Sequence, residues 1–229
     1  IDGDRNTVSS CSVLNHSYGV TIDGDRNTVT GNHVFKNSYF GIWVKRTTEN
    51  RVEANRIYRN DKGLYLSHAD GSVVSNNSMA NNTYGIHLES TEHAVLRHNV
   101  VADNLERGLH YCCHSQGNII YGNTFIRNTA NARGYGGPTS WNTSSGGNYW
   151  GDYTGNGSYV IDNENVDRRP LRQPVATTRF TDSIYIISPA DGRTVNGSLV
   201  VSGVSEQARP IDISVDNGSW TAAQGTFMW

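Results

Sequence analysis

Short runs in which apolar and polar residues alternate recur along the first half of the chain, and they return at a fixed spacing. Five of these runs open with a glycine that is followed by an apolar, a variable and a second apolar residue: Gly19, Gly41, Gly63, Gly85 and Gly108. The steps between them are 22, 22, 22 and 23 residues. Alternation with a period of two predicts β-strands, whereas the spacing of an amphipathic helix is not found.

The repeat extends beyond these runs. The octapeptide IDGDRNTV occupies residues 1–8 and again residues 22–29. A unit of about 22 residues with three short strands predicts one coil of a parallel β-helix, in which coils stack about 4.8 Å apart. Val20 and Ile22 should then point inward and Thr21 outward. Equivalent asparagines should stack and hydrogen-bond as a ladder through their side-chain amides. The predicted ladder consists of Asn32, Asn55, Asn77, Asn99 and Asn123.

The repeat fades after Asn128, and a distinct tail follows. It contains the segments GNYWGDY (147–153), YVID (159–162) and VDRRPL (166–171). These segments, together with the coils, resemble the NosD-like family of bacterial and archaeal exterior proteins. The resemblance implies a right-handed parallel β-helix, a relation to carbohydrate-binding and sugar-hydrolase domains, and a link to the maturation of copper enzymes. We therefore expect about six coils over residues 1–147 and a cap over 148–175, with Tyr149, Trp150 and Tyr153 covering the last coil.

Residues 176–183 are polar and predict a linker, and residues 184–229 resemble the opening of a bacterial or archaeal Ig-like domain. The resemblance rests on the segments SPADG (188–192) and VDNGSW (215–220). An Ig sandwich takes about 100 residues, so this part predicts a partial sandwich that is either truncated or completed by another molecule. The repeat also starts without a preceding cap. We therefore expect either a segment of a longer protein or a first coil covered by another coil or subunit.

Composition limits the partners and the location. The chain has 229 residues and a net charge of −2, which argues against nucleic acid as a partner. Its apolar runs are too short for a membrane span. The sequence predicts an extracellular, cell-surface or periplasmic location and offers Asn142, Asn156, Asn196 and Asn217 as glycosylation candidates.

One outward column of the predicted coils is aromatic. Alternation places Trp43, Tyr65, His87 and His110 one above another on the same face. Exposed rings stack on sugar faces, so this column is a candidate carbohydrate-binding track. Stacking of this kind also stabilises a sheet, and a ladder covered by a loop is the alternative.

Carboxylates offer one candidate acid–base site. Asp70 and Glu92 lie 22 residues apart, so they should be neighbours in adjacent coils, with His68 and His87 nearby. Two solvated turn carboxylates are the alternative, and we favour it. The chain lacks the D-P-H-D motif of β-helix alginate epimerases and the acidic calcium cluster of pectate lyases. Activity as a polysaccharide hydrolase, lyase or epimerase is therefore the less favoured prediction.

Histidine and cysteine are concentrated in the segment HYCCH (110–114). His110, Cys112 and His114, with His87 one coil away, are candidate ligands for copper or zinc. A disulfide between Cys112 and Cys113 is an equal alternative, and the favoured prediction is a protein without a cofactor. Cys11 falls at a ladder position, where we expect a small, buried, apolar side chain.

These observations favour a structural or adhesive surface protein whose coils form a rigid rod. Its partners would be copies of itself or neighbouring surface domains, and a head-to-tail contact would produce a filament, sheath or layer. A module that binds or processes polysaccharide is the first alternative. A metal-handling accessory protein of the NosD type is the second.

Overall fold

The computed structural model describes residues 1–175, 184–188, 202–205, 212–213 and 221–222. The chain divides into two units, Ile1–Thr177 and Thr178–Trp229. The first unit is a right-handed parallel β-helix with coils of about 22 residues, as the sequence predicts. No helix among the described residues is long and apolar enough to span a membrane.

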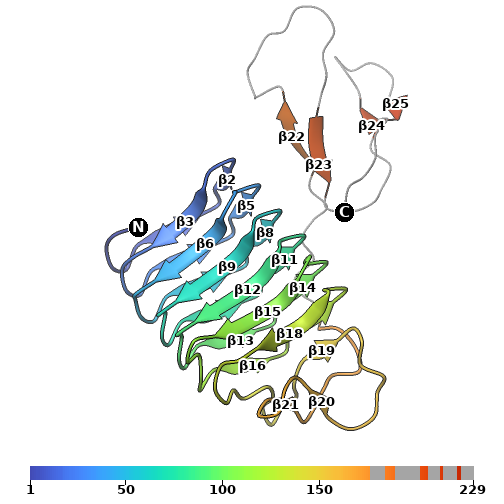
Figure 1. Ribbon diagram of the computed structural model, residues 1–229. Coiled ribbons are helices and arrows are strands. Elements are labelled where there is room, and N and C mark those ends of the chain that lie inside the picture. Colours follow the sequence, from blue (N-terminus) through green and yellow to red (C-terminus); the bar gives the residue numbers. More distant parts are fainter. Residues whose placement is uncertain (176–183, 189–201, 206–211, 214–220, 223–229) are drawn as a thin grey trace, which may run out of the picture. The chain divides into compact units, whose positions relative to one another are not determined.

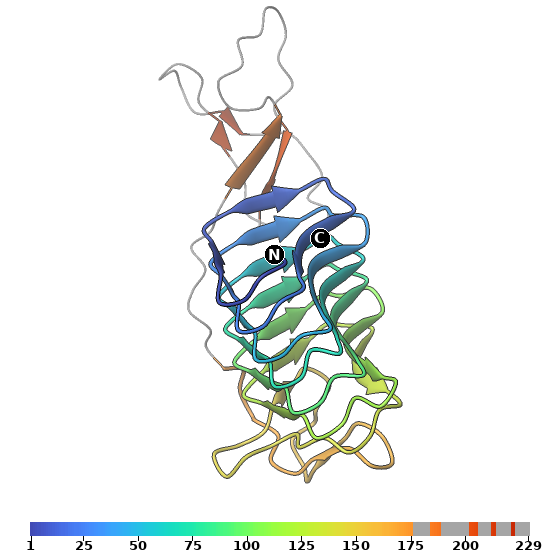
Figure 2. The same cartoon turned by 90° about the vertical axis from the view of Figure 1, so that its left-hand side faces the viewer.

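Each coil contributes one strand to each of three parallel sheets, and the strands stack in register (Figures 1 and 2). The first sheet contains β1 (Thr7–Ser9), β4 (Thr28–Thr30), β7 (Arg51–Glu53), β10 (Val73–Ser75), β13 (Val95–Arg97) and β16 (Ile119–Tyr121). The second contains β2 (Ser12–Leu14), β5 (His33–Phe35), β8 (Arg56–Tyr58), β11 (Ser78–Ala80), β14 (Val100–Ala102), β17 (Thr124–Ile126) and β19 (Tyr149–Trp150). The third contains β3 (Tyr18–Ile22), β6 (Phe40–Lys45), β9 (Lys62–Ser67), β12 (Tyr84–Glu89), β15 (Arg107–Cys112) and β18 (Ala130–Gly134).

The core runs along the axis as columns of stacked apolar side chains. In the third sheet Ile22, Val44, Leu66 and Leu88 are fully buried, and Tyr111 continues the column. Full burial of one such aliphatic side chain stabilises the fold by about 1.5–3 kcal/mol. The alternation that predicted the strands therefore arises from one face meeting this core.

Asparagine ladders close the corners of the coils. The Asn77 side chain donates to the Asn99 carbonyl oxygen at 3.0 Å and accepts from the Asn55 amide at 3.0 Å. Asn32, Asn55, Asn77, Asn99 and Asn123 continue this pattern from coil to coil. A parallel ladder runs through Asn37, Asn60, Asn82, Asn104 and Asn128. Each chain of bonds satisfies buried amides where the backbone turns.

The left-handed backbone of the corners falls on the residue before each ladder asparagine. Before Asn32, Asn55 and Asn77 these residues are Gly31, Ala54 and Asn76, with φ values of 65°, 53° and 57°. The ladder asparagines themselves are therefore selected for their amides and not for a tolerance of positive φ. Side chains with a Cβ are disfavoured in this conformation by about 1–2 kcal/mol, so stacking has to offset that cost.

An aromatic plug covers the last coils. Trp150 is buried and stacks on Phe125, with ring centroids 4.8 Å apart, and on Tyr159 at 4.2 Å. The fully buried Asp167 accepts hydrogen bonds from the Trp150 indole at 2.9 Å and from the Asn148 backbone at 2.7 Å. A short antiparallel pair, β20 (Tyr159–Val160) and β21 (Val166–Asp167), holds these residues in place.

The second unit is described only at four strands. β22 (Ile184–Ser188) pairs antiparallel with β23 (Ser202–Ser205), and β24 (Asp212–Ile213) pairs antiparallel with β25 (Thr221–Ala222). The predicted linker at 176–183, the rest of the predicted Ig-like part and the sequons at Asn196 and Asn217 lie outside the described residues.

Candidate functional site

The outward face of the third sheet carries the aromatic column that the sequence predicts. The backbone register aligns Trp43 with Tyr65, Tyr65 with His87, and His87 with His110. Ring centroids along the column lie 6.0, 5.0 and 4.6 Å apart. The solvent exposure of the side chains decreases at the end of the column. Trp43, Tyr65 and His87 are half-buried, whereas His110 is only 7% exposed.

Three side chains of types that can bind a metal ion meet at the buried end of this column. The ligand atoms of His87, His110 and Cys112 all lie within 4.8 Å of one another. The Nε2 atom of His87 is 3.5 Å from the Sγ atom of Cys112. Strand β12 supplies His87, and the neighbouring strand β15 supplies His110 and Cys112 two residues apart, so both point outward. Although its side chain faces outward, Cys112 is only 3% exposed.

The final strand of the sheet encloses the cluster. The Nδ1 atom of His110 lies 3.0 Å from the backbone carbonyl of Arg133 on β18, and the Tyr135 ring lies 5.9 Å from the His110 ring. When Nδ1–H donates to that carbonyl, the lone pair of Nε2 remains available to a metal ion. The Arg107 guanidinium also lies 2.5 Å from Nδ1, but it can only donate, so the two contacts require opposite protonation of that atom. The carbonyl contact is the one that suits metal binding.

The environment of the cluster lowers the pKa of both imidazoles and so favours their neutral form. Burial lowers the pKa of His87 to about 3, and the nearby His110 and Lys62 act in the same direction. Burial is also the main cause that lowers the pKa of His110. The Nδ1 atom of His87 is buried and has no hydrogen-bond partner among the described residues. Neutral histidine is the form that binds metals.

The cysteine carries its proton in this environment. Burial, and then a hydrogen bond with the Cys113 thiol, raise the pKa of Cys112 to about 12. A metal ion would therefore have to displace this proton to bind the thiolate. The Sγ atoms of Cys112 and Cys113 are 2.8 Å apart, and both thiols are free in this structure.

The structure places the remaining histidine and cysteine candidates elsewhere. His114 is exposed and is not among the three converging side chains, which include the other candidate, His87. The expectation that Cys11 is buried is wrong, because Cys11 is exposed. Its backbone N–H donates to Asn32 at 3.0 Å, so it does hold a ladder position. In the described chain no earlier coil stacks on it, and burial at a ladder position needs a coil on both sides.

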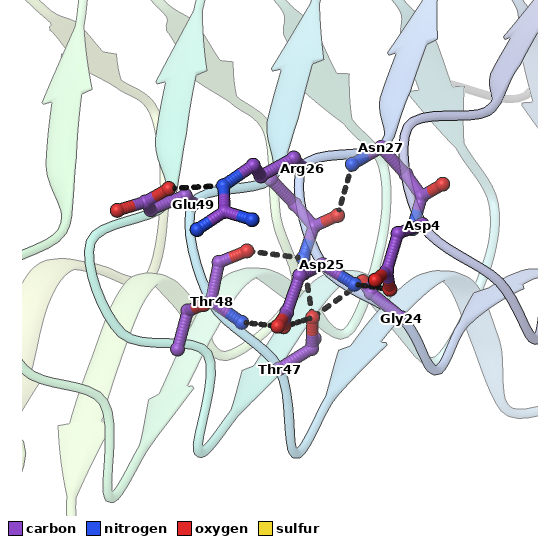
Figure 3. Close-up of polar contacts among 9 residues, drawn as sticks. Asp4, Gly24, Asp25, Arg26, Asn27, Thr47, Thr48 and Glu49 are labelled. Atoms are coloured by element: carbon purple, nitrogen blue, oxygen red, sulfur yellow. Dashed lines mark hydrogen bonds and ion pairs between the residues drawn. The ribbon is translucent and has the colours of Figure 1, made fainter.

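Asp70 and Glu92 lie at a corner of the coil. The backbone N–H of Glu92 donates to the Asp70 carboxylate at 2.8 Å, and Gln116 donates to the Glu92 carboxylate at 2.9 Å. Asp4 and Asp25 form the same corner bond in the first coils, also at 2.8 Å (Figure 3).

This corner recurs one coil further on, where the Asp25 carboxylate accepts from the Thr48 backbone at 2.7 Å and the Thr47 hydroxyl at 2.9 Å (Figure 3). The corner thus accounts for the Asp70–Glu92 pair as a bond between coils. His68 is exposed, with its Nδ1 atom 3.3 Å from the Ser67 hydroxyl, whereas His87 faces Cys112.

Of the four glycosylation candidates, Asn142 and Asn156 lie within the described residues, and they differ in their surroundings. Asn156 is exposed in the loop that precedes β20. Asn142 is half-buried, and its side-chain oxygen accepts a hydrogen bond from the Arg168 backbone at 3.1 Å. Of the two, Asn156 is the more accessible for modification.

The fold and the site define a parallel β-helix with a largely buried His–His–Cys cluster on two neighbouring strands of the third sheet. The family model described as "Periplasmic copper-binding protein (NosD)" matches residues 1–155, so the chain belongs to the NosD family. This confirms the resemblance drawn from the coils and the GNYWGDY segment. No curated protein and no solved structure matches the chain.

Proposed function

We propose that this protein is a periplasmic or cell-surface β-helix that binds one copper ion as cargo through His87, His110 and Cys112. The observation that supports the proposal most strongly is the convergence of their three ligand atoms within 4.8 Å of one another, with His110 and Cys112 buried and His87 half-buried. The family to which the chain belongs is described as periplasmic and copper-binding, which agrees with this donor set.

The chemistry of the cluster favours copper. Two imidazoles and one thiolate are the trigonal donor set of copper electron-transfer sites, and thiolate prefers soft ions such as Cu(I). The positive charges of Lys62 and Arg107 act on both histidines. Cu(I) with one thiolate is neutral overall, whereas Zn(II) with one thiolate keeps a positive charge. The cationic neighbours therefore penalise zinc more than Cu(I).

Each residue has a defined part in holding the ion. Cys112 supplies the charge-neutralising thiolate, and His87 supplies the Nε2 atom that faces it. The Arg133 carbonyl orients the His110 ring by accepting from Nδ1. Burial of the cluster excludes water, which protects a thiolate and a Cu(I) ion from oxidation and exchange.

Anaerobic titration of the whole protein with Cu(I), followed by metal analysis after gel filtration, tests this proposal. We expect one equivalent bound by the native protein and loss of binding in Cys112→Ser and in His87→Ala. His114→Ala is the matched control, since His114 is exposed and close to the cluster in sequence, and it should still bind one equivalent. A native protein that elutes without copper would refute the proposal.

A scaffold role is compatible with copper binding. Stacked coils with continuous ladders resist bending, which suits a rod that presents a site or connects neighbouring surface proteins. Electron microscopy of the purified chain tests the assembly part of this role. Regular filaments or layers would support a structural or adhesive function, and dispersed single particles at high concentration would argue against it.

Carbohydrate binding is a second candidate function, supported by exposed rings at the start of the third sheet. Tyr18 and Tyr39 are 48% and 54% exposed, and their rings stack 5.8 Å apart. Tyr18 also stacks on Trp43 at 5.7 Å, so the platform continues the predicted track. Retention on immobilised polysaccharide should fall in the Tyr18→Ala and Trp43→Ala variants. It should persist in Tyr135→Ala, which removes an exposed ring from another place.

A further inference from the structure

A groove open to solvent lies next to the proposed copper site. It has a volume of about 590 Å³, and its lining includes Cys113, His114, Tyr135, Asp162, Asn163 and Glu164. The lining does not include His87, His110 or Cys112. Cys113 lines the groove and also contacts Cys112, so it lies between the groove and the buried ligands.

The backbone explains this position of Cys113. Its φ of 56° places it at the corner that follows each strand of the third sheet, where Arg46, His68 and Ser90 have φ values of 51°, 51° and 45°. The corner directs Cys113 away from the column that Cys112 continues. The two sulfur atoms are nevertheless 2.8 Å apart, which is close enough for one ion to contact both.

We propose that Cys113 is the exchange ligand of the site, through which a Cu(I) ion enters from the groove and leaves again. The inference rests on the proposed copper-binding function. On entry, the Cys113 sulfur forms a bond to Cu(I) as the bond to the delivering ligand breaks, and the Cys113 thiol proton passes to the released ligand or to water. The Cys112 sulfur then forms its bond as the Cys113 bond breaks, and the proton of the Cys112 thiol moves to Cys113. The oxidation state of copper and the total number of protons stay the same in this internal step.

The Tyr135 hydroxyl supports the assignment. It lies 3.9 Å from the Cys113 sulfur, while the Tyr135 ring packs against His110. One exposed side chain therefore contacts both the exchange thiol and a buried ligand. This arrangement positions Cys113 at the boundary between groove and cluster.

Transfer kinetics test this role without any assay of activity. The native protein and the Cys113→Ser variant are loaded anaerobically with one equivalent of Cu(I). An excess of a coloured Cu(I) chelator is then added, and transfer is followed by absorbance. We expect the equilibrium affinity for Cu(I) to change little. The rate of transfer should fall by about tenfold or more, because the activation barrier is higher without the Cys113 sulfur. Cys11→Ser is the control, since this thiol is exposed and lies several coils away from the cluster.

A second variant tests the groove without altering a thiol. Asn163→Trp places a large ring on the exposed groove wall and should also slow transfer at unchanged stoichiometry. Native rates in both variants would overturn the inference, and so would loss of equilibrium binding in Cys113→Ser, which would make Cys113 a permanent ligand. Both results leave the proposed function intact. Failure of the native protein to bind Cu(I) would instead overturn the proposed function itself.

Discussion

The Nε2 atom of His87 lies 3.5 Å from the Sγ atom of Cys112, although 25 residues separate them in the chain. The coil length produces this contact. Residues 87 and 110 are paired across adjacent strands, and Cys112 follows two residues later on the same face. A repeat of about 22 residues can therefore gather distant side chains into one site when each falls on the same column.

The protonation of Cys112 predicts how copper affinity depends on pH. Its pKa is raised to about 12, so the thiol is protonated at neutral pH and each ion bound releases one proton. Neither histidine consumes or releases a proton above pH 6.5, since the pKa of each is lowered. Affinity should therefore rise about tenfold per pH unit between pH 6.5 and 8.5.

Competition with a Cu(I) chelator at several pH values measures this slope. The Cys113→Ser variant should show the same slope, because Cys113 does not belong to the equilibrium ligand set. A slope of two in the native protein that falls to one in this variant would mean that both thiolates bind at equilibrium.

Removal of one ladder amide should cost a large part of the stability of the β-helix. Asn77 is fully buried and donates to the Val52 carbonyl at 2.8 Å and to the Asn99 side chain at 3.0 Å. Asn77→Ala removes these two donor contacts and also removes the oxygen that accepts from the buried Asn55 backbone N–H at 2.9 Å and from the Asn55 side-chain amide at 3.0 Å. We expect the free energy of unfolding to fall by about 2–5 kcal/mol. Urea denaturation followed by circular dichroism measures the change.

The matched control is Asn156→Ala, at an exposed loop position. It should alter the free energy of unfolding by less than about 0.5 kcal/mol. Equal effects at the two positions would show that the ladder adds nothing specific to stability.

The repeat made the fold predictable, because alternation sets the inward face and the 22-residue spacing sets which residues stack. Val20, Ile22 and Thr21 point as the pattern indicates. Burial at the ends of the stack was not predictable in this way, as Cys11 shows. Its ladder position implies burial only if a coil lies on both sides.

The composition of the site was predictable only in part. His110 and Cys112 follow from strand alternation, whereas His114 was grouped with them through its closeness in sequence. The structure brings together His110, Cys112 and the candidate His87 and leaves out His114, because parallel strands bring residues one coil apart closer together than residues beyond a corner. The groove beside Cys113 depends on the loop at 134–137 and the tail at 162–164, which lie outside the repeat and follow no periodic pattern.

The cap should depend on the buried carboxylate of Asp167. One of its oxygens accepts from the Asn148 backbone and the Trp150 indole, and the other accepts from the Arg169 backbone at 3.0 Å. In Asp167→Asn, one carboxylate oxygen becomes an NH2 group, which donates hydrogen bonds and would face an N–H group that is itself a donor. We expect a loss of about 1–3 kcal/mol in the free energy of unfolding. Asp2→Asn, at an exposed position, is the control that separates this loss from a general effect of charge.

Replacement of alanine by glycine should stabilise the protein at a corner of the coil and destabilise it within a strand. Ala54 has a φ of 53°, a conformation that glycine adopts without the penalty of a Cβ. Ala54→Gly should therefore raise the free energy of unfolding by up to about 1 kcal/mol, since the gain in the folded state is offset in part by greater freedom of the unfolded chain.

Ala80 lies within β11, outside the left-handed region, and Ala80→Gly should lower the same quantity by about 0.5–1 kcal/mol. Thermal and urea denaturation of both variants and of the native protein measure these changes in the free energy of unfolding. Destabilisation by Ala54→Gly as large as that by Ala80→Gly would contradict the view that the residue before each ladder asparagine carries backbone strain. In that case the alanine methyl group, and not the φ angle, would determine which residue this corner accepts.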